Sequence, residues 1–348
     1  MKVALVGVTG YSGTVLYQLL CQHPAVDEIN LYGHSEVNIH LSAVLPYLRT
    51  PTDPMIYALN VHKLMAENDC VFFATSAGVT AKLAGEFIAA KFPVIDLSGD
   101  MRLKDPAAYS KWYHKEPAAA ADLAQATYGL AEFTPKLSSY VANPGCYATA
   151  TLLGLAPLVQ QKLIDVQTII VDAKSGTTGA GKKLAPSTHF ANADENFSVY
   201  KANKHQHIPE IVQQLQAWDH NVTALQFTTS LLPVARGIMS SIYAKVQPEL
   251  TTQGAGTVNA KLTAAFKSTY ADAPCVHLAG ADLPTLRDVN YSNLDAIGWL
   301  YNPDTQVVTV ISVIDNLLKG AAGQALQNFN QMFGYPETTA IPLQPALI

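Results

Sequence analysis

Residues 3–13 read VALVGVTGYSG, and this stretch decides the fold of the first part of the chain. Its short β-branched run predicts a buried parallel strand, its three glycines predict a tight turn, and the TVLYQLLCQHP that follows has the periodicity of a helix. Glycines let the main chain approach a pyrophosphate, and a helix N-terminus favours its negative charge. The order of strand, turn and helix therefore predicts a dinucleotide-binding site. Because the spacing is GxxGxxG and not GxGxxG, a glycine-rich turn that binds no ligand is the alternative.

The alternation of strands and helices continues beyond this turn. EINLYGHS (28–35), DCVFFATSAG (69–78) and FPVIDLSGDMRL (92–103) each read as a strand followed by a turn. Turns after parallel strands lie at the carboxyl edge of the sheet, where open α/β sheets bind their ligands. The candidate cofactor neighbours in these turns are Ser35, Ala74, Thr75 and Ser98.

Charged and polar groups in the same turns suggest which anions they could meet. His34 and Ser35 could donate hydrogen bonds to the 2′-phosphate of NADP, whereas Glu36 would repel that phosphate if it pointed inward. The sequence therefore favours NADP over NAD only weakly. Arg102 is a candidate clamp for a substrate anion, and a structural arginine is the alternative.

Length and composition restrict the class of protein. The chain has 348 residues, of which 49% are hydrophobic and 14% charged. We therefore expect two domains, and either large cores or surface hidden in an oligomer. The net charge is −5 and no cluster of Lys and Arg occurs, which argues against a nucleic-acid partner. MKVALVGVTG is not a signal peptide, and the longest apolar runs, such as VVTVISVI (307–314), are the length of a strand. We therefore expect a cytoplasmic protein that does not enter a membrane.

The second half of the chain has a different pattern. TIIVDAKSGTTGAGKK (168–183) reads as a strand and a loop, but no Ser or Thr follows its lysines, so it is not a nucleotide-binding P-loop. IMSSIYAKVQ (238–247) and QVVTVISVI (306–314) read as strands without regular crossover helices, which favours a mixed sheet. GAAGQALQNFNQMFG (320–334) predicts an amphipathic helix that would return to the first domain.

Together these patterns predict an α/β chain of two domains. We expect a Rossmann-like dinucleotide-binding domain at 1–145, completed by 320–348. We expect an α+β catalytic domain with a mixed sheet at 146–319.

NPGCYATA (143–150) is the strongest candidate for chemistry. Pro-Gly forces a turn, and the small residues after Cys146 can begin a helix whose N–H groups would stabilise a thiolate and a developing oxyanion. Asn143 could add a side-chain donor, and a buried structural thiol is the alternative. Cys21, Cys70 and Cys275 lack this context and are expected to serve packing. With no CxxC pair, neither a disulfide framework nor a zinc site is expected.

KHQHIPE (204–210) supplies candidate acid–base groups. His205 and His207 are two residues apart, and Glu210 follows His207 by three, so a carboxylate could orient an imidazole. A surface histidine pair is one alternative. A metal site is another, but no third strong ligand is evident, and we expect no metal.

Two further turns hold candidate contacts. Arg236 in LLPVARG (231–237) could hold a substrate carboxylate or phosphate, or could form a structural ion pair. Asn293 in NYSNLDAIG (290–298) could meet a nicotinamide carboxamide, or could simply form the turn.

The motifs resemble, in order and along nearly the whole chain, those of the N-acetyl-γ-glutamyl-phosphate reductases, within the wider aspartate-semialdehyde-dehydrogenase-like group. The matching stretches are GVTGYSG (7–13), ATSAG (74–78), DLSGDMRL (96–103), YGLAE (128–132), NPGCYATA (143–150), KSGTTGAGK (174–182), HQHIPEI (205–211), LLPVARGI (231–238) and NYSNLDAIGW (290–299). NPGCYAT together with HxHxPEI is the most specific part of the resemblance.

The resemblance implies a reaction. The family is a group of phosphorylating aldehyde dehydrogenases that reduce N-acetyl-L-glutamyl 5-phosphate with NADPH in arginine biosynthesis. Cys146 would form a thioester, and a histidine of the HxH pair would act as acid and base. We favour His207, because Glu210 falls one helical turn later, with His205 as the second choice. Arg102 and Arg236 would hold the phosphate and carboxylate of the substrate.

The resemblance also implies a cofactor site and an assembly. The expected cofactor-binding residues are Gly7, Thr9, Gly10, Tyr11, Ser12, Gly13, Ser35, Thr75, Ser98, Ser175, Gly176 and Asn293. The second domain would also serve dimerisation, in a homodimer or homotetramer. Two alternatives are a relative that acts on a carrier-bound aminoadipyl phosphate and a non-catalytic NADP sensor with the same fold.

Overall fold

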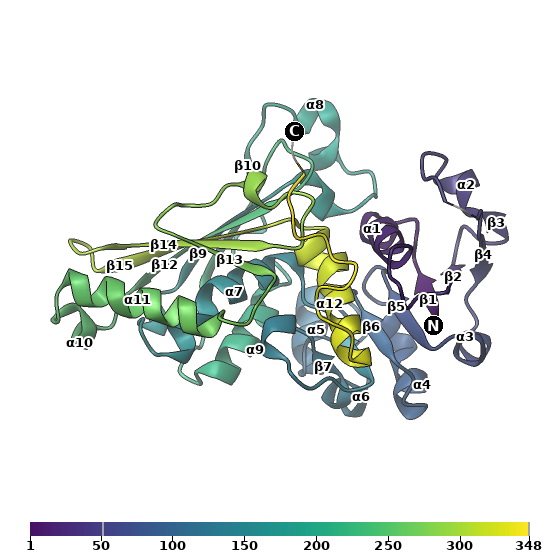
Figure 1. Cartoon of the computed structure of the whole chain (residues 1–348), viewed down its shortest axis with the longest axis horizontal. Helices are drawn as coiled ribbons and strands as arrows, with labels where there is room; N and C mark the ends of the chain where they lie inside the picture. Colours follow the sequence, from purple (N-terminus) through teal and green to yellow (C-terminus); the bar gives the residue numbers. More distant parts are fainter. Residues whose placement is uncertain (51, 347–348) are drawn as a thin grey trace. The chain divides into compact units, whose positions relative to one another are not determined.

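Two sheets organise the chain (Figure 1). The computed structural model describes residues 1–50 and 52–346. A first unit contains Met1–Pro144 and Ala321–Ile341, and a second contains Gly145–Gly320 with the described residues from Pro342 onward. Each unit has its own sheet and its own helices.

The first sheet is parallel apart from one edge strand, and its spatial order is β3-β4-β2-β1-β5-β6-β8-β7. Its short apolar strands have the composition of strands buried on both faces, as the sequence predicts. The strands are β1 (Lys2–Val6), β2 (Glu28–Gly33), β3 (Ile39–His40), β4 (Met55–Ala58), β5 (Cys70–Phe73), β6 (Val94–Asp96), β7 (Thr127–Tyr128) and β8 (Tyr140–Ala142).

Helices cover both faces of this sheet. They are α1 (Tyr11–Leu20), α2 (Leu41–Val44), α3 (Val61–Glu67), α4 (Ala84–Ala89), α5 (Pro106–Tyr113), α6 (Ala120–Gln125) and α12 (Gly323–Phe333), with short 3-10 turns at Thr80–Lys82 and Ala131–Phe133. Two adjacent residues of β5 show the arrangement, because successive side chains of a strand point to opposite faces. The ring of Phe72 lies 5.6 Å from that of Phe329 in α12, and the ring of Phe73 lies 5.5 Å from that of Phe87 in α4.

The order of strands reverses at β1, which lies between β2 and β5. Val6 at the carboxyl end of β1 pairs with Tyr32 on one side and Phe73 on the other. In open α/β sheets, a ligand binds at such a reversal, outside the carboxyl ends of the strands. The loops after β1, β2 and β5 therefore lie where a dinucleotide would bind.

The second sheet is mixed, as predicted, in the order β10-β11-β9-β12-β15-β14-β13. The β9–β11 and β13–β14 pairs are parallel and the other neighbours are antiparallel. The strands are β9 (Ile170–Ser175), β10 (Ser198–Tyr200), β11 (Gln226–Leu231), β12 (Ile238–Lys245), β13 (Val276–Gly280), β14 (Asp295–Asn302) and β15 (Val307–Ile314).

One long apolar helix forms the core of this unit. In α7 (Cys146–Gln160), every residue from Tyr147 to Val159 is buried, and the helix packs on β12 and β15. Figure 1 shows α7 and α11 on the same face of the sheet. The other helical segments are α8 (Phe190–Ala193), α9 (Ile208–Trp218), α10 (Pro248–Thr251) and α11 (Ala255–Thr269), short 3-10 turns at Val166–Thr168, Thr177–Ala180, Pro186–Thr188 and Leu286–Asp288, and a π-helical turn at Leu318–Ala322.

The opposite face of the second sheet is partly open. Ile170 pairs with Tyr243, Tyr243 with Thr309, and Thr309 with Leu300, so these side chains form a row across four strands. The three apolar members of the row, Ile170, Tyr243 and Leu300, are 47%, 36% and 45% exposed. Among the described residues, no helix is both long enough and apolar enough to cross a bilayer.

Candidate active site and cofactor site

Cys146 is the first residue of α7, as the sequence predicts. Gly145 is the N-cap in an extended conformation, and because it is a glycine it has no side chain that could cap the helix. The thiol is partly buried. The N–H groups of the first helical turn place partial positive charge at this position, which stabilises a negative charge on sulfur.

The start of α9 packs against the start of α7. His207 is the N-cap of α9, and a Cβ built on Gly145 would lie 2.3 Å from Nε2 of that imidazole. The N–H of Gly145 donates to Oε1 of Glu210 at 2.7 Å, and the Glu210 carboxylate is fully buried. The structure therefore brings Cys146, His207 and Glu210 together around one glycine. That Glu210 orients His207 stays a prediction.

His205 lies in an aromatic cage behind this pair. Its ring centroid is 5.1 Å from Tyr147, 6.1 Å from Tyr200 and 4.7 Å from His207, and its side chain is 5% exposed. Its Nδ1 accepts the N–H of His207 at 3.2 Å. Burial is the main cause of the lowered pKa of His205, and the positive charges of His207 and Lys201 lower it further, to about 2. His205 therefore stays neutral at physiological pH, which leaves His207 as the better acid–base candidate.

Two tyrosines that the sequence analysis missed complete the surroundings of the thiol. The hydroxyl oxygens of Tyr147 and Tyr200 are 2.8 Å apart. Burial raises the pKa of Tyr200 to about 12 and raises the pKa of Tyr147 further, so both hydroxyls keep their protons at neutral pH. Tyr147 is the neighbour of Cys146 in NPGCYATA and could have been found there, whereas Tyr200 belongs to β10, and only the fold brings it here.

Gly320 is a second neighbour that the sequence analysis missed. A Cβ at this position would lie 2.8 Å from the Cβ of Cys146. The π-helical turn that contains Gly320 follows β15, and the sequence around it, LLKGAA, reads only as the start of a helix. The close packing of this glycine fixes one side of the cysteine.

Arg236 forms a structural ion pair, which was one of the two roles that the sequence allowed for it. Its Nη1 lies 3.2 Å from Oδ2 of the buried Asp315, and the guanidinium carbon lies 4.7 Å from the centre of the Tyr291 ring. The side chain is still 19% exposed. Its predicted contact with substrate is not tested by these interactions.

The residues predicted to contact the nicotinamide from the second unit mostly make contacts within that unit. Ser175 is buried and its hydroxyl donates to the carbonyl of Gly176 at 3.0 Å. Position 176 requires a glycine, because a Cβ there would lie 2.7 Å from the carbonyl oxygen of Ala235. Asn293 is fully buried, and its amide donates to Sγ of Cys275 at 3.5 Å.

In the first unit, Arg102 and Asn143 hold main-chain segments. Nε of Arg102 donates to the carbonyl of Asn143 and its Nη2 donates to the carbonyl of Leu97, both at 2.8 Å. The Asn143 side chain is fully buried, accepts from Asn328 at 2.9 Å and donates to the carbonyl of Ala321 at 3.2 Å. These bonds join the loops at the carboxyl ends of β6 and β8. The predicted roles of both residues toward substrate stay predictions.

The turn after β1 has the shape of a pyrophosphate cradle. Gly7 has a φ of +95°, and a Cβ there would lie 2.6 Å from the carbonyl oxygen of Ala74, while a Cβ on Gly13 would lie 2.1 Å from the carbonyl oxygen of Gly7. These two glycines are required by packing. A Cβ on Gly10 would have no neighbour closer than 3.7 Å, and α1 begins after Gly10 without a side-chain cap. The amides at the start of α1 are thus open to an anion.

The other predicted cofactor contacts divide by exposure. Tyr11 and Ser35 are exposed, and Thr9, Ser12 and Thr75 are half-buried around the same turns. Ser98 is buried, and its hydroxyl lies 2.7 Å from that of Thr80.

Ser98 belongs to a buried polar network that the sequence analysis missed. Both carboxylate oxygens of Asp100 accept the N–H of Gly78, and Tyr109 donates to Asp100 at 2.6 Å. Burial, with the charge of Asp100, raises the pKa of Asp96 to about 6. The network joins the loop after β5 to the loop after β6.

The prediction that Cys21 serves packing is wrong. Cys70 and Cys275 are buried, but Cys21 is exposed, because α1 ends at Leu20 and Cys21 follows its last residue. None of the four cysteines forms a disulfide. Within residues 1–50 and 52–346, no three His, Cys, Asp or Glu side chains gather so as to hold a metal ion.

Two family models match most of the chain. The semialdehyde dehydrogenase NAD binding domain matches residues 2–139, and the semialdehyde dehydrogenase dimerisation domain matches residues 146–316.

Curated relatives match along its whole length. An N-acetyl-gamma-glutamyl-phosphate reductase 2 of Lactiplantibacillus plantarum is 54% identical over 346 residues, or 99% of each chain. An N-acetyl-gamma-glutamyl-phosphate reductase of Limosilactobacillus fermentum is 52% identical over 349 residues, or 100% of each chain.

Solved structures share the fold. Aspartate semialdehyde dehydrogenase II of Vibrio cholerae, complexed with ASA, aligns with a TM-score of 0.70 at 18% identity over 96% of this chain and 98% of that one. Aspartate semialdehyde dehydrogenase of Candida albicans, with NADP, aligns with a TM-score of 0.64 at 14% identity over 95% and 98%. At these identities the likeness shows the fold alone.

Proposed function

This chain belongs to the N-acetyl-gamma-glutamyl-phosphate reductase family, and we propose that it carries out the reaction of that family through the thiol of Cys146. The reaction reduces N-acetyl-L-glutamyl 5-phosphate to N-acetyl-L-glutamate 5-semialdehyde and releases phosphate. The observation that carries the proposal is the position of Cys146 as the first residue of α7, with the His207 ring packed on the glycine before it. The cytoplasmic location expected from the sequence stays a prediction.

Cys146 supplies the nucleophile. The sulfur forms a bond with the acyl carbon while the bond from that carbon to the phosphate oxygen breaks, which leaves a thioester and inorganic phosphate. We assign the main-chain N–H groups at the start of α7 to stabilise the negative charge that develops on the carbonyl oxygen. Tyr147 and Tyr200 keep their hydroxyl protons and place two polar groups near the sulfur.

His207 is the group that moves protons. It accepts the thiol proton before the attack and donates it to the carbonyl oxygen as hydride transfer forms the thiohemiacetal. It then takes the hydroxyl proton back as the carbonyl re-forms, the carbon–sulfur bond breaks and the thiolate is released with the aldehyde. We assign His205 a different role, because burial lowers its pKa to about 2 and its Nδ1 accepts the main-chain N–H of His207.

The first unit binds a nicotinamide dinucleotide. The uncapped start of α1 and the space beside Gly10 fit a pyrophosphate. When bound, the reduced cofactor supplies the hydride that reduces the thioester. We propose NADP(H) as the preferred form, with the exposed Ser35 after β2 as a donor to the 2′-phosphate. Glu36 beside it is half-buried.

Arg236 is the arginine we assign to a substrate anion. Its side chain is 19% exposed, whereas Arg102 is a buried residue that donates to two main-chain carbonyls. The Tyr291 ring and Asp315 hold the Arg236 guanidinium in one orientation. A fixed guanidinium favours bidentate binding of a carboxylate or phosphate.

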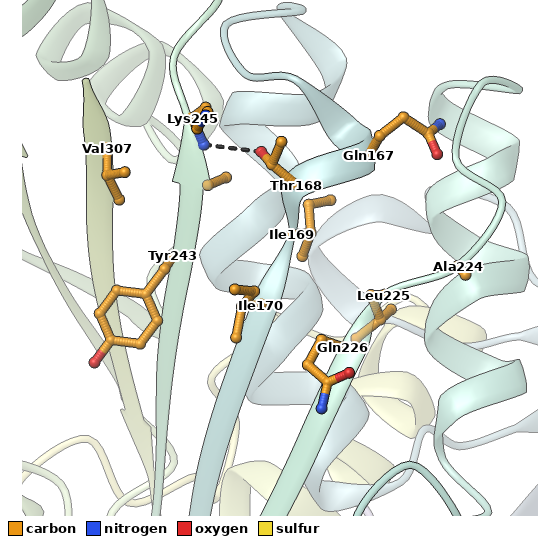
Figure 2. Close-up of a pocket in the computed structure, with 11 residues that line it drawn as sticks. Gln167, Thr168, Ile169, Ile170, Ala224, Leu225, Gln226, Tyr243, Lys245 and Val307 are labelled. Carbon is orange, nitrogen blue, oxygen red and sulfur yellow. Dashed lines mark hydrogen bonds between the residues drawn. The ribbon is translucent and has the colours of Figure 1, made fainter. Parts of the chain in front are cut away.

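We also propose that the open face of the second sheet pairs with a second copy of this chain. The row of Ile170, Tyr243 and Leu300 leaves apolar side chains in water in a single copy, and burial of apolar surface favours association by roughly 25 cal/mol per Å². Ile170 and Tyr243 line a hollow of about 500 Å³ on this face. Figure 2 shows both side chains, with Gln167, Gln226 and Lys245 among the residues around them. An apolar centre with a polar rim is typical of an interface between subunits.

The test is the reverse reaction. The purified chain is mixed with N-acetyl-L-glutamate 5-semialdehyde, phosphate and NADP⁺, and NADPH formation is followed by absorbance. We expect a rate that requires phosphate, that is lower with NAD⁺ and that disappears in Cys146→Ser. A rate that is independent of phosphate, or that survives in Cys146→Ser, contradicts the proposal.

A further inference from the structure

The main chain on either side of Gly145 is held at two consecutive peptide groups. The N–H of Gly145 donates to the buried Glu210 carboxylate at 2.7 Å. The carbonyl of Gly145 accepts from the N–H of Thr149 at 2.8 Å and from its hydroxyl at 3.2 Å. Cys146 follows directly, so its Cα is fixed by these bonds and, from the other side, by the contact with Gly320.

Glu210 reaches this glycine from a different segment of the chain. It lies in the first turn of α9, the same turn that begins with the His207 N-cap. Two residues of this turn therefore contact Gly145: the His207 ring packs against it, and a carboxylate oxygen of Glu210 accepts its N–H. One rigid helix start therefore sets both the nucleophile and its acid–base partner.

A fully buried carboxylate beside a thiol has an electrostatic cost. A negative charge near sulfur disfavours the thiolate, so a role in charge alone would work against the chemistry. A hydrogen bond from a main-chain N–H to a charged carboxylate is strong and directional, which suits a positional role. The bond at Gly145 gives the Glu210 carboxylate such a positional contact.

We infer that Glu210 is a positioning residue for Cys146, which acts by holding the Gly145 main chain and not by holding a charge on His207. The inference rests on the proposed function of Cys146. It predicts that the acceptor oxygen of residue 210 matters and that its negative charge does not.

Two substitutions separate the oxygen from the charge. Glu210→Gln keeps an oxygen that can accept the Gly145 N–H, and Glu210→Ala removes it. Glu249→Gln is the matched control, because Glu249 lies in the first turn of α10 and is exposed. All proteins carry Cys21→Ser, so that the exposed thiol does not react with the probe.

The first readout is kinetic and uses the phosphate-dependent reverse reaction. We expect Glu210→Gln and Glu249→Gln to keep kcat within about threefold of the parent. We expect Glu210→Ala to lower kcat by about 100-fold, which is the scale on which a 1 Å misplacement costs activity, with little change in KM for the semialdehyde. A kcat of Glu210→Ala equal to that of the parent overturns the inference.

The second readout uses no substrate. The rate of alkylation of Cys146 by iodoacetamide, measured against pH, gives the pKa of its thiol. The other titratable groups around the start of α7 are unchanged in every variant: they are Tyr147, Tyr200, His205, His207 and Lys319. We expect the pKa in Glu210→Gln to equal that of the parent or to fall below it, because a negative charge has been removed.

The opposite result identifies the other role. If Glu210→Gln raises the thiol pKa and loses as much kcat as Glu210→Ala, the carboxylate stabilises charge on His207, and the inference is wrong. Should Glu210→Ala fail to show a normal melting transition, Glu210→Gln alone decides between the two roles. Failure of the proposed function looks different, because the parent enzyme itself would then be inactive while the alkylation profiles could still be compared.

Discussion

Gly145 is the residue on which the reactive groups of the second unit converge. Its Cα lies against the His207 ring, its N–H is bound by Glu210, and Cys146 follows it. A side chain of any size would displace the imidazole, because a Cβ would lie 2.3 Å from Nε2. The proposed reactivity of the thiol therefore depends on a neighbour that has no side chain.

The two histidines differ enough in environment to separate their roles. His207→Asn removes the proton carrier, so we expect kcat to fall by about 100-fold or more. His205→Asn should cost less in kcat, because His205 is neutral and acts through a hydrogen bond to the main chain. Steady-state kinetics of both variants in the reverse reaction makes the comparison, and the reverse ranking would refute the assignment of His207.

His205 also gives the folded chain a pH dependence. Its pKa is about 2 in the folded chain, against 6.5 for an ordinary histidine. Between these values the unfolded chain binds a proton that the folded chain does not, so the free energy of unfolding falls as the pH falls below 6.5. The slope for one proton is about 1.4 kcal/mol per pH unit.

We therefore expect the wild type to lose more stability than His205→Asn when the pH falls from neutral to mildly acidic. Urea unfolding of both proteins at several pH values measures the difference. Asp96, whose raised pKa acts in the opposite direction, is present in both proteins and cancels in the comparison. Parallel curves for the two proteins would show that His205 titrates normally.

At the scale of elements, α1 and α7 begin in the same way. Each follows an extended glycine N-cap, Gly10 and Gly145, and neither has a side-chain cap. Each start therefore leaves main-chain N–H groups available for negative charge. In the first unit we assign that charge to the pyrophosphate, and in the second to the thiolate and the developing oxyanion.

Both helix starts could be predicted because their signals are local. GVTGYSG and NPGCYATA each contain the turn residues and the beginning of the helix within eight residues or fewer. Tyr200 and Gly320 could not be predicted, because they reach Cys146 from β10 and from the turn after β15. For Ser98, the turn could be predicted but the contact could not. Its hydroxyl hydrogen-bonds to that of Thr80, which lies 18 residues away in the sequence and which no local pattern indicates.

A pair of glycine substitutions tests the α1 site. Gly10→Ala has room for its methyl group, so we expect a folded protein with at least about tenfold weaker NADPH binding, because close main-chain approach is lost. Gly13→Ala places its methyl group 2.1 Å from the Gly7 carbonyl, so we expect a lower melting temperature. Fluorescence titration with NADPH and thermal unfolding measure the two effects. Unchanged NADPH affinity in Gly10→Ala would contradict the assigned cradle.

At the scale of the whole molecule, the chain consists of two units with separate sheets and separate candidate sites. The sequence predicts domain boundaries at 145/146 and 319/320 and assigns 320–348 to the first domain. The units of the structure divide at Pro144/Gly145 and at Gly320/Ala321, and the described residues from Pro342 onward belong to the second unit. The functions given to the two domains stay proposals. The open face of the second sheet could not be predicted, because alternation along single strands does not reveal which face a partner covers.

The proposed pairing of two copies predicts the effect of a charge on the open face. Tyr243→Lys places a cation in the middle of the apolar row, so we expect a shift toward monomer at micromolar protein concentration. Tyr47→Lys is the control, because Tyr47 is 70% exposed and belongs to the first unit. Sedimentation velocity measures the species. A wild type that is already monomeric, or a Tyr243→Lys protein with unchanged assembly, would contradict the proposed interface.

The most direct test of the account is a search for the acyl group on Cys146. The enzyme is mixed with N-acetyl-L-glutamyl 5-phosphate without NADPH, quenched in acid, digested and analysed by mass spectrometry, while released phosphate is counted. The account predicts about one phosphate per active site and an N-acetylglutamyl adduct on the peptide that contains Cys146, both absent in Cys146→Ser. Phosphate release without an adduct, or an adduct on another residue, would contradict it.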